Sequence, residues 1–230
     1  MNTEIQIPEL SVAEVALKYP QALEVLNKYR IDYCCGGKRT FQEACEKAGA
    51  PYDEVWEQIT KNDIETGLPV NFKKWSPSLL VDYILDQHHT YVKEAIPLLN
   101  ELLDKVCDVH GKAYPELAEV RKSFSILSDE LNEHMLKEER ILFPAIKKME
   151  QQEQPFLLDG PLEVMMDEHE AAGNLIKQIR SYTSNYTLPN DVCTTYRMTY
   201  QKLEAFDNDL MHHIHLENNI LFEKVKQGVQ

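Results

Sequence analysis

The chain contains one short pattern twice, centred on His134 and again, 79 residues later, on His213. Each copy has a histidine, a glutamate four residues further on, and apolar residues around them: Leu131-x-x-His134-x-x-x-Glu138-x-x-Ile141-Leu142-Phe143 and Leu210-x-x-His213-x-x-x-Glu217-x-x-Ile220-Leu221-Phe222. Residues four apart lie on the same face of an α-helix. A polar pair among core residues costs free energy unless a partner satisfies it. Two such pairs facing each other predict a metal site between two helices.

Periodic apolar residues from residue 76 onward predict four long amphipathic helices. Ser76-Pro77 suits the start of the first helix, Gly160-Pro161 opens the third, and the fourth follows Pro189. The apolar spacing alternates between three and four residues, which favours a bundle with crossing angles of about 20°. Short connections predict up-down-up-down order. We therefore expect an all-α protein with a four-helix bundle over residues 76–227.

Shorter periodic segments before the bundle predict a small helical domain over residues 1–65. Ser11 is placed to cap a first helix and Pro20 to open a second, and two more segments begin near Phe41 and Val55. The periodicity breaks at residues 66–71, which are rich in turn-forming residues. We expect a linker over residues 66–75.

The composition narrows the class of partner. The chain has 38 acidic and 24 basic residues and a net charge of −14, which argues against binding nucleic acid or an anionic membrane. No apolar run is long enough to span a bilayer, and residues 1–10 lack the pattern of a secretory signal. The five cysteines lack the spacing of a disulfide framework. We expect reduced thiols and a cytoplasmic location.

Each of the four long helices places one histidine on its apolar face, and two of them add a glutamate: His89, His134, Glu138, His169, His213 and Glu217. Four imidazoles and two carboxylates exceed what one tetrahedral zinc ion binds, and no thiolate shares these faces. Mixed imidazole and carboxylate ligation suits iron or manganese. We expect two ions, each with two histidines, bridged by both glutamates, with room for an oxo or hydroxo bridge and an open position on each ion.

Other polar residues near these positions call for separate interpretations. His88 neighbours His89 but points about 100° away around the helix, so the apolar face favours His89 as the ligand. His212 and His215 fall off the face of His213, and we expect them at the surface or behind the ligands. Glu168, beside His169, is a candidate hydrogen-bond acceptor or proton relay, with a solvated side chain as the alternative.

The chain resembles the iron–sulfur cluster repair di-iron proteins of the RIC or ScdA type. The duplicated His-x-x-x-Glu pattern resembles their hemerythrin-like domain, and Asp32-Tyr33-Cys34-Cys35-Gly36-Gly37 resembles the CCGG motif of their N-terminal domain. The resemblance covers almost the whole chain. It implies a hemerythrin-like bundle that holds two non-haem iron ions, oxo- or hydroxo-bridged, through the six residues named above.

The third helix departs from oxygen-carrying hemerythrins, which have a second histidine four residues after the first. Here that position is Gly173. One ligand fewer implies a more open and symmetric site, less suited to reversible oxygen carriage and more suited to reaction or release of iron.

The vicinal thiols of Cys34 and Cys35 admit a structural and a functional interpretation. Free cysteine is often a small buried residue, and two glycines readily form a turn. However, Lys38 and Arg39 follow directly, and nearby cations lower the pKa of a thiol. We therefore expect Cys34 and Cys35 to accept electrons, to hold iron transiently, or to contact a client protein. A disulfide between neighbouring cysteines is disfavoured by geometry.

The family resemblance implies repair of iron–sulfur clusters damaged by nitric oxide or reactive oxygen, with proteins that carry such clusters as partners. Iron donation and reductive removal of nitric oxide both fit an open site. Two alternatives stay open: a hemerythrin-like sensor or store for oxygen or nitric oxide, and a di-iron nitric oxide reductase. A homodimer is a further expectation from the family.

Overall fold

The computed structural model describes residues 10–19, 21–61, 71–152 and 158–228, and the described residues are overwhelmingly helical. Their only extended pairing is an isolated antiparallel bridge between Ser11 and Thr40. The prediction of an all-α fold is confirmed. No helix in the described part of the chain is long and apolar enough to cross a membrane.

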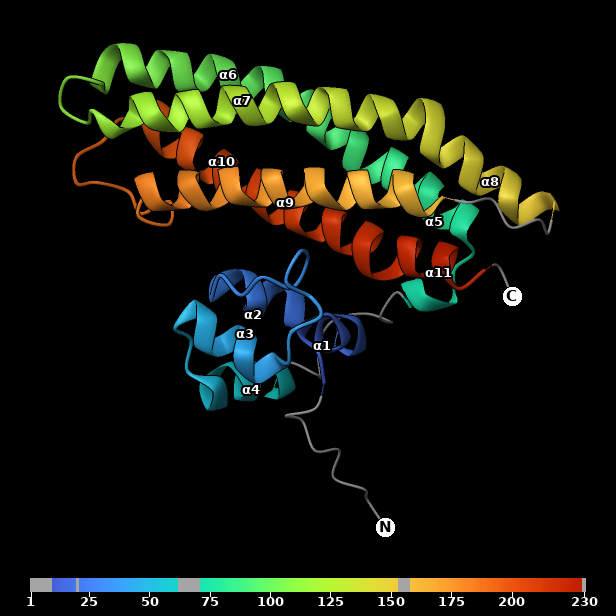
Figure 1. The fold of residues 1–230 in the computed structure, drawn as a ribbon. Coiled ribbons are helices and arrows are strands. Elements are labelled where there is room, and N and C mark those ends of the chain that lie inside the picture. Colours follow the sequence, from blue (N-terminus) through green and yellow to red (C-terminus); the bar gives the residue numbers. More distant parts are fainter. Residues whose placement is uncertain (1–9, 20, 62–70, 153–157, 229–230) are drawn as a thin grey trace.

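Four long rods form the bundle, and three of them are composites of successive helical segments. Figure 1 shows them running up-down-up-down, as predicted. α6 packs on α7 and α10, and α7 packs on α9. The rods are α5 (Pro77–Tyr83), η3 (Ile84–His89) and α6 (Thr90–His110); α7 (Glu116–Lys137), η4 (Glu138–Leu142) and α8 (Phe143–Gln152); α9 (Asp159–Tyr182); and α10 (Thr194–Leu216), η5 (Glu217–Leu221) and α11 (Phe222–Lys226).

Three rods contain a π-helical turn, which the sequence periodicity does not predict. These turns are η3, η4 and η5, and each contains one of the six residues expected to bind metal. A π-turn inserts one extra residue per turn and is found mostly at functional sites. Here His89 ends η3, Glu138 begins η4 and Glu217 begins η5.

Local capping explains where the helices begin. Ser76 accepts a hydrogen bond from the backbone N–H of Leu79, and Pro77 occupies the first helical position, as predicted. Ser11 forms a capping box with Glu14 at the start of α1 (Val12–Lys18), which confirms its predicted role. Thr40 and Glu43 form the same arrangement at α3 (Phe41–Ala48).

The N-terminal domain consists of α1, α2 (Ala22–Lys28), α3 and α4 (Tyr52–Lys61). Helices were expected in all four places. Pro20, expected to open the second helix, lies outside the described residues, as do positions 66–70 of the expected linker. The last part of that linker forms a 3₁₀ turn, η2 (Phe72–Lys74), whose Phe72 ring packs against Trp75 and Tyr83.

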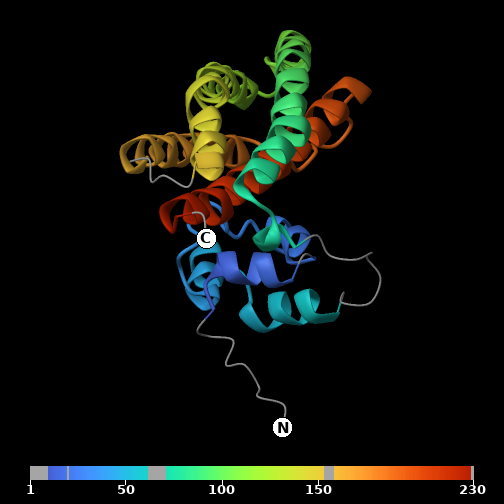
Figure 2. The same cartoon turned by 90° about the vertical axis from the view of Figure 1, so that its right-hand side faces the viewer.

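The N-terminal domain lies against one side of the bundle, below α9 and α10 in Figure 1 and in the turned view of Figure 2. Its core residues form one continuous cluster with those of the bundle. Arg30 pairs with Glu204 at 2.6 Å, and the Lys177 ammonium lies 3.3 Å from Asp32. The two domains therefore share an interface that is apolar at its centre and ionic at its edge.

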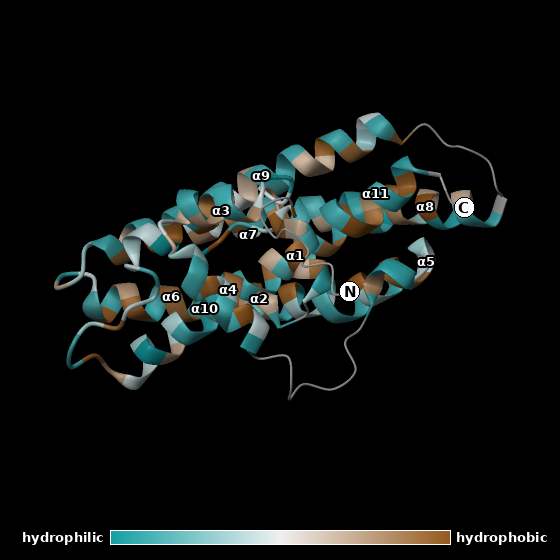
Figure 3. Cartoon of the chain, turned by 90° about the horizontal axis from the view of Figure 1, so that it is seen from below, coloured by the Kyte–Doolittle hydropathy of each residue, from teal (hydrophilic) through white to brown (hydrophobic). Residues whose placement is uncertain are grey.

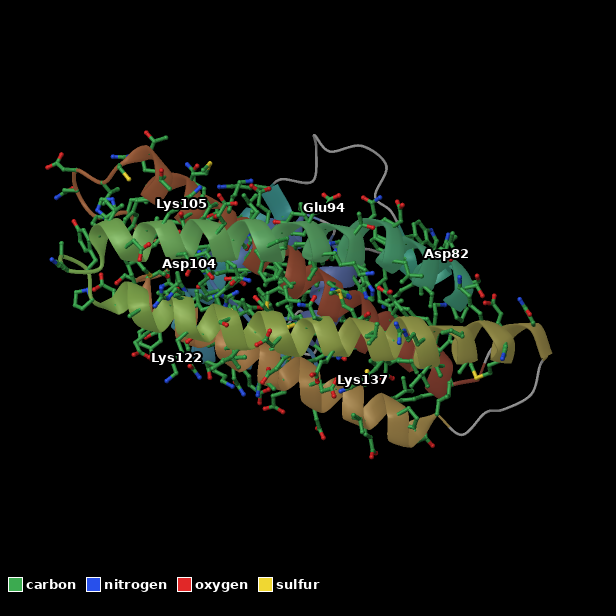
Figure 4. The ribbon with its side chains drawn as sticks, turned by 90° about the horizontal axis from the view of Figure 1, so that it is seen from above. Asp82, Glu94, Asp104, Lys105, Lys122 and Lys137 are labelled. Carbon is green, nitrogen blue, oxygen red and sulfur yellow. The ribbon has the colours of Figure 1, made fainter. Side chains whose placement is uncertain are left out.

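The face of the bundle opposite the N-terminal domain is charged. Figure 4 looks down on this face and labels Glu94, Asp104 and Lys105 of α6 and Lys122 of α7, all of them exposed. Figure 3, seen from the N-terminal side, shows hydrophilic and hydrophobic residues alternating along the helices. Acidic and basic side chains are thus both exposed on this face of the bundle.

Candidate metal centre

Six side chains of the bundle converge, and all four imidazoles point their Nε2 atoms at two carboxylates. The Nε2 atoms of His89 and His134 lie 3.3 and 3.4 Å from Glu138 Oε2. Those of His169 and His213 lie 3.1 and 3.0 Å from the oxygens of Glu217. The i,i+4 spacing of the duplicated pattern places each of these glutamates beside a histidine of its own rod.

The six residues divide into two groups of four that share both glutamates. One group contains His89 and His213, and the other contains His134 and His169. Within each group the ligand atoms lie within 4.8 Å of one another, and every residue is buried. Each group therefore offers four donor atoms that could hold a cation, and the two groups share both carboxylates.

Several polar atoms of this cluster are buried without a hydrogen-bond partner: His89 Nε2, both oxygens of Glu138, His213 Nδ1 and Glu217 Oε2. A buried polar atom without a partner costs about 1–3 kcal/mol, and more when charged. In addition, the Nε2 atoms of His134 and His169 face each other at 3.0 Å. A cation between these atoms removes both costs, so the donor set fits a bound metal.

Charge compensation shifts the pKa values of the same side chains. Burial would lower the pKa of His134, but the Glu138 carboxylate raises it to about 9. Burial would raise the pKa of Glu217, but His213 and His169 hold it well below its ordinary value. The carboxylates are therefore ionised and attract positive charge, which protons or metal ions can supply.

The outward-facing Nδ1 atoms of three histidines have acceptors at 2.8 Å: His89 has Glu139 Oε1, His134 has Glu168 Oε2, and His169 has Asn218 Oδ1. Because these oxygens only accept, each Nδ1 donates its proton to them, so Nε2 is the nitrogen left to bind either a proton or a metal ion. This is the tautomer that a metal ligand needs. Sequence reasoning identified Glu168 and missed Glu139 and Asn218, although both directly follow the glutamate of the duplicated pattern.

The other two buried histidines, His215 and His88, lie outside both groups of donor atoms. His215 was expected at the surface or behind the ligands, but it is buried and its Nδ1 donates to the backbone oxygen of Tyr33. Burial lowers its pKa to about 4, so the ring is neutral. His88 is also buried, with its Nδ1 3.0 Å from Asp209 Oδ1, and belongs to neither group of donor atoms.

The cysteine loop, residues 32–37, is shaped by its aspartate and its glycines. Asp32 Oδ1 accepts hydrogen bonds from the backbone N–H groups of Cys35 and Gly36. A Cβ on Gly37 would lie 2.7 Å from Asn219 Oδ1 and 2.8 Å from the Tyr33 oxygen. Only glycine fits there, because the loop packs directly against the C-terminal rod.

The same loop brings both thiols to the bundle beside the metal-centre helices. Cys35 Sγ lies 3.5 Å from the backbone oxygen of His169 and 3.5 Å from where a Cβ of Gly173 would stand. Cys34 Sγ lies 3.5 Å from Met211 Sδ. Cys35 therefore covers the position at which oxygen-carrying hemerythrins have their additional histidine.

The Cys34 thiol is not activated in the way the sequence suggested. Burial, Cys35 and the carboxylate of Asp32 raise the pKa of Cys34 well above its ordinary value. Lys38, expected to lower the pKa, is directed to Glu223 at 3.8 Å. The expectation of a thiolate stabilised by neighbouring cations is therefore wrong for Cys34, because the nearest fixed charge is negative. Both thiols are free, with their sulfurs 3.5 Å apart.

A cavity of about 240 Å³ reaches the His134–His169 side of the centre from the surface. His134, His169 and Glu168 line it, together with Lys137, whose ammonium pairs with Glu168 at 2.5 Å. A small ligand or ion that enters this cavity meets two of the imidazoles.

Comparison with known proteins agrees with this architecture. The family profile for the hemerythrin HHE cation binding domain matches residues 80–225, and that for the ScdA_N domain, described as a domain of unknown function (DUF542), matches residues 9–63.

The chain is 35% identical over 224 residues to a protein of Musicola paradisiaca, covering 96% of this chain and 97% of the relative. It is 36% identical over 217 residues to a protein of Cronobacter sakazakii, covering 94% and 96%. It is 33% identical over 219 residues to a protein of Yersinia pseudotuberculosis, covering 95% and 97%. All three relatives carry the name iron-sulfur cluster repair protein YtfE.

Proposed function

The chain belongs to the family of iron–sulfur cluster repair proteins, and we propose that it restores clusters damaged by nitric oxide or reactive oxygen by supplying iron to them. Its partners are then proteins that carry such clusters. The observation that supports this proposal is the pair of four-residue donor groups that share Glu138 and Glu217. A cytoplasmic location and a homodimer stay predictions.

Two non-haem iron ions are proposed as the cations of this centre, held by His89, His134, Glu138, His169, His213 and Glu217. Nitrogen and carboxylate oxygen donors suit iron, and no thiolate lies in either group, which disfavours a structural zinc site. Bound ferrous ions would supply exchangeable iron and open coordination positions. The protein's own part is to hold the imidazoles in one tautomer and to balance the charge with two ionised carboxylates.

We propose that Cys34 and Cys35 hold iron on its way out of the bundle. Asp32, Cys34 and Cys35 form a third group whose ligand atoms lie within 4.8 Å of one another. Cys35 contacts the backbone of His169, so this group lies beside the bundle centre. Because Cys34 is protonated in this setting, a cation that binds there must displace the thiol proton.

The proposal is tested by anaerobic recovery of activity in a [4Fe–4S] dehydratase damaged with nitric oxide and mixed with the iron-loaded protein. We expect recovery that exceeds the effect of free ferrous iron at matched concentration and is lost in the Glu138→Ala/Glu217→Ala variant. A Cys34→Ser/Cys35→Ser variant that still binds two irons but restores activity more slowly would assign the thiols to transfer. Recovery no better than with free iron would reject direct repair by this protein.

The same assay separates the alternative functions. Repeated consumption of nitric oxide with an electron donor and no client protein would identify a nitric oxide reductase. A stable, slowly dissociating gas adduct without cluster recovery would identify a sensor or store.

A further inference from the structure

The metal centre is built from two similar pairs of rods, so its residues can be matched across the pairs. The duplicated pattern matches His134 with His213, and the single histidines of the other two rods match His89 with His169. The residues just before these single histidines also match: His88 in one rod and Glu168 in the other. Any functional difference between the two cation positions must come from places where matched residues differ.

The side chains that follow the bridging glutamates play equivalent parts. Glu139, after Glu138, accepts from His89 Nδ1, and Asn218, after Glu217, accepts from His169 Nδ1, each at 2.8 Å. Each copy of the pattern therefore fixes the histidine of a neighbouring rod. Both halves of the centre therefore have an acceptor at this place, a carboxylate for His89 and an amide oxygen for His169.

The side chains that precede the single histidines do not play equivalent parts. Glu168 accepts from His134 Nδ1, but His88, its counterpart, turns its own Nδ1 toward Asp209. The His88 ring instead stacks face to face on His213, with ring centroids 5.3 Å apart and planes 8° apart. Because the two rings are stacked, His88 offers no hydrogen-bond acceptor to His213 Nδ1. This nitrogen is buried without a partner.

This difference bears on metal binding through His213. A cation bound at Nε2 leaves the proton on Nδ1. With no acceptor, that N–H stays buried and unsatisfied, and the ring is less firmly oriented. Loss of such an acceptor behind a ligand typically weakens metal binding about 10- to 100-fold. His134 and His169, the histidines of the other position, both have their acceptors.

We infer that the two cation positions are unequal, and that the one between His89 and His213 binds its ion about 10- to 100-fold more weakly because His88 stands where a carboxylate is needed. Under the proposed function, on which this last step rests, the weakly held ion is the one delivered to a client. The position between His134 and His169 then keeps its ion and preserves the shape of the centre.

The test is anaerobic titration of the metal-free full chain with ferrous iron in competition with a chromogenic chelator, which yields two affinities. Repulsion between two bound cations would also make the two affinities unequal. The result that tests the inference is therefore how each affinity changes on substitution. We expect His88→Glu to raise the weaker affinity about 10-fold or more and to leave the tighter one unchanged. We expect Asn218→Ala, which removes the acceptor from His169, to lower the tighter affinity instead. His110→Glu, the same substitution at the far end of α6, serves as the matched control.

Equal affinities in the unsubstituted protein would overturn the inference. So would a His88→Glu variant with normal circular dichroism and Tm whose weaker affinity is unchanged. If His88→Glu does not fold, an Asn218→Ala variant with both affinities intact would overturn it. If the protein fails to repair clusters but its two iron affinities are unequal and change as expected on substitution, the proposed function alone is rejected. If it repairs clusters but binds two ions with equal affinity, this inference alone is rejected.

Discussion

The bundle centre and the cysteine loop both gather potential metal ligands, but they are stabilised in different ways. The bundle centre consists of nitrogen and oxygen donors on long helices, positioned by the i,i+4 periodicity of those helices and by hydrogen bonds to Nδ1 atoms. The cysteine loop offers sulfur donors without regular structure, positioned by its own aspartate and by contacts from α9 and the C-terminal rod. In the bundle centre, regular helices fix the spacing of the donors within each rod, whereas the loop has no regular structure and is placed by its own hydrogen bonds and by contacts with the bundle.

This difference matches the chemistry that each region can perform. A rigid set of imidazoles and carboxylates stores borderline and hard cations such as ferrous iron, while thiolates favour softer ions and iron–sulfur assemblies. A loop that depends on tertiary contacts can change more readily than a helix core. The comparison therefore predicts that substitutions in the bundle centre abolish metal binding, whereas substitutions around the loop alter thiol exposure and leave binding intact.

The largest effect is expected from Glu138→Ala/Glu217→Ala, because both cation positions share these carboxylates. We expect iron affinity to fall by more than about 100-fold, since loss of even an acceptor behind a ligand costs about 10- to 100-fold. The iron-to-protein ratio after anaerobic gel filtration measures this. Glu94→Ala/Glu119→Ala removes two exposed glutamates as a control and should retain full iron loading.

Gly37→Ala should disturb the loop without emptying the centre. Its Cβ would meet Asn219 Oδ1, the Tyr33 oxygen and the Ala13 Cβ within 2.9 Å, so the loop must move. Overpacking of this kind costs about 1–3 kcal/mol. We expect a lower Tm and faster alkylation of Cys34, with iron loading unchanged. Gly160→Ala, whose Cβ would meet nothing within 4 Å, is the matched control. Loss of iron from Gly37→Ala would show that the two regions are not separable.

Two substitutions at Gly173 sharpen the contrast further. Gly173→Ala places a methyl group in ordinary contact with Cys35 Sγ at 3.5 Å and should stabilise α9 by up to about 1 kcal/mol. Gly173→His places an imidazole where Cys35 lies and should expel that thiol, seen as faster alkylation of Cys35. Equal alkylation rates in both variants would mean that Cys35 does not occupy this space in solution.

The sequence predicted these two regions unequally, for physical reasons. The four rods and the convergence of residues such as His134 and Glu138 follow from periodicity, which is visible along the chain. The π-turns were not predicted, because a single inserted residue barely alters an apolar pattern. The role of His215 was misjudged because its buried environment is created by the N-terminal domain, which no bundle periodicity reports. The same holds for Cys34, whose pKa is governed by burial and Asp32 rather than by the cations that follow it in sequence.

The smallest effect is expected from Asp32→Asn, since an amide oxygen still accepts the hydrogen bonds of Cys35 and Gly36. Burial would raise the pKa of Asp32, but the Gly36 N–H and the Lys177 ammonium hold it below its ordinary value. A carboxyl group with a lowered folded-state pKa stabilises the fold above its unfolded pKa of about 3.9 and loses this contribution as pH falls through the folded value. The stability difference between the unsubstituted chain and Asp32→Asn should therefore be constant at neutral pH and should begin to shrink as the solution is acidified below about pH 4. Urea unfolding of both proteins from pH 7 to pH 3 measures it. A difference that stays the same from pH 7 to pH 3 would mean that the carboxylate charge of Asp32 does not hold the loop to α9, and that the loop depends on its packing contacts alone.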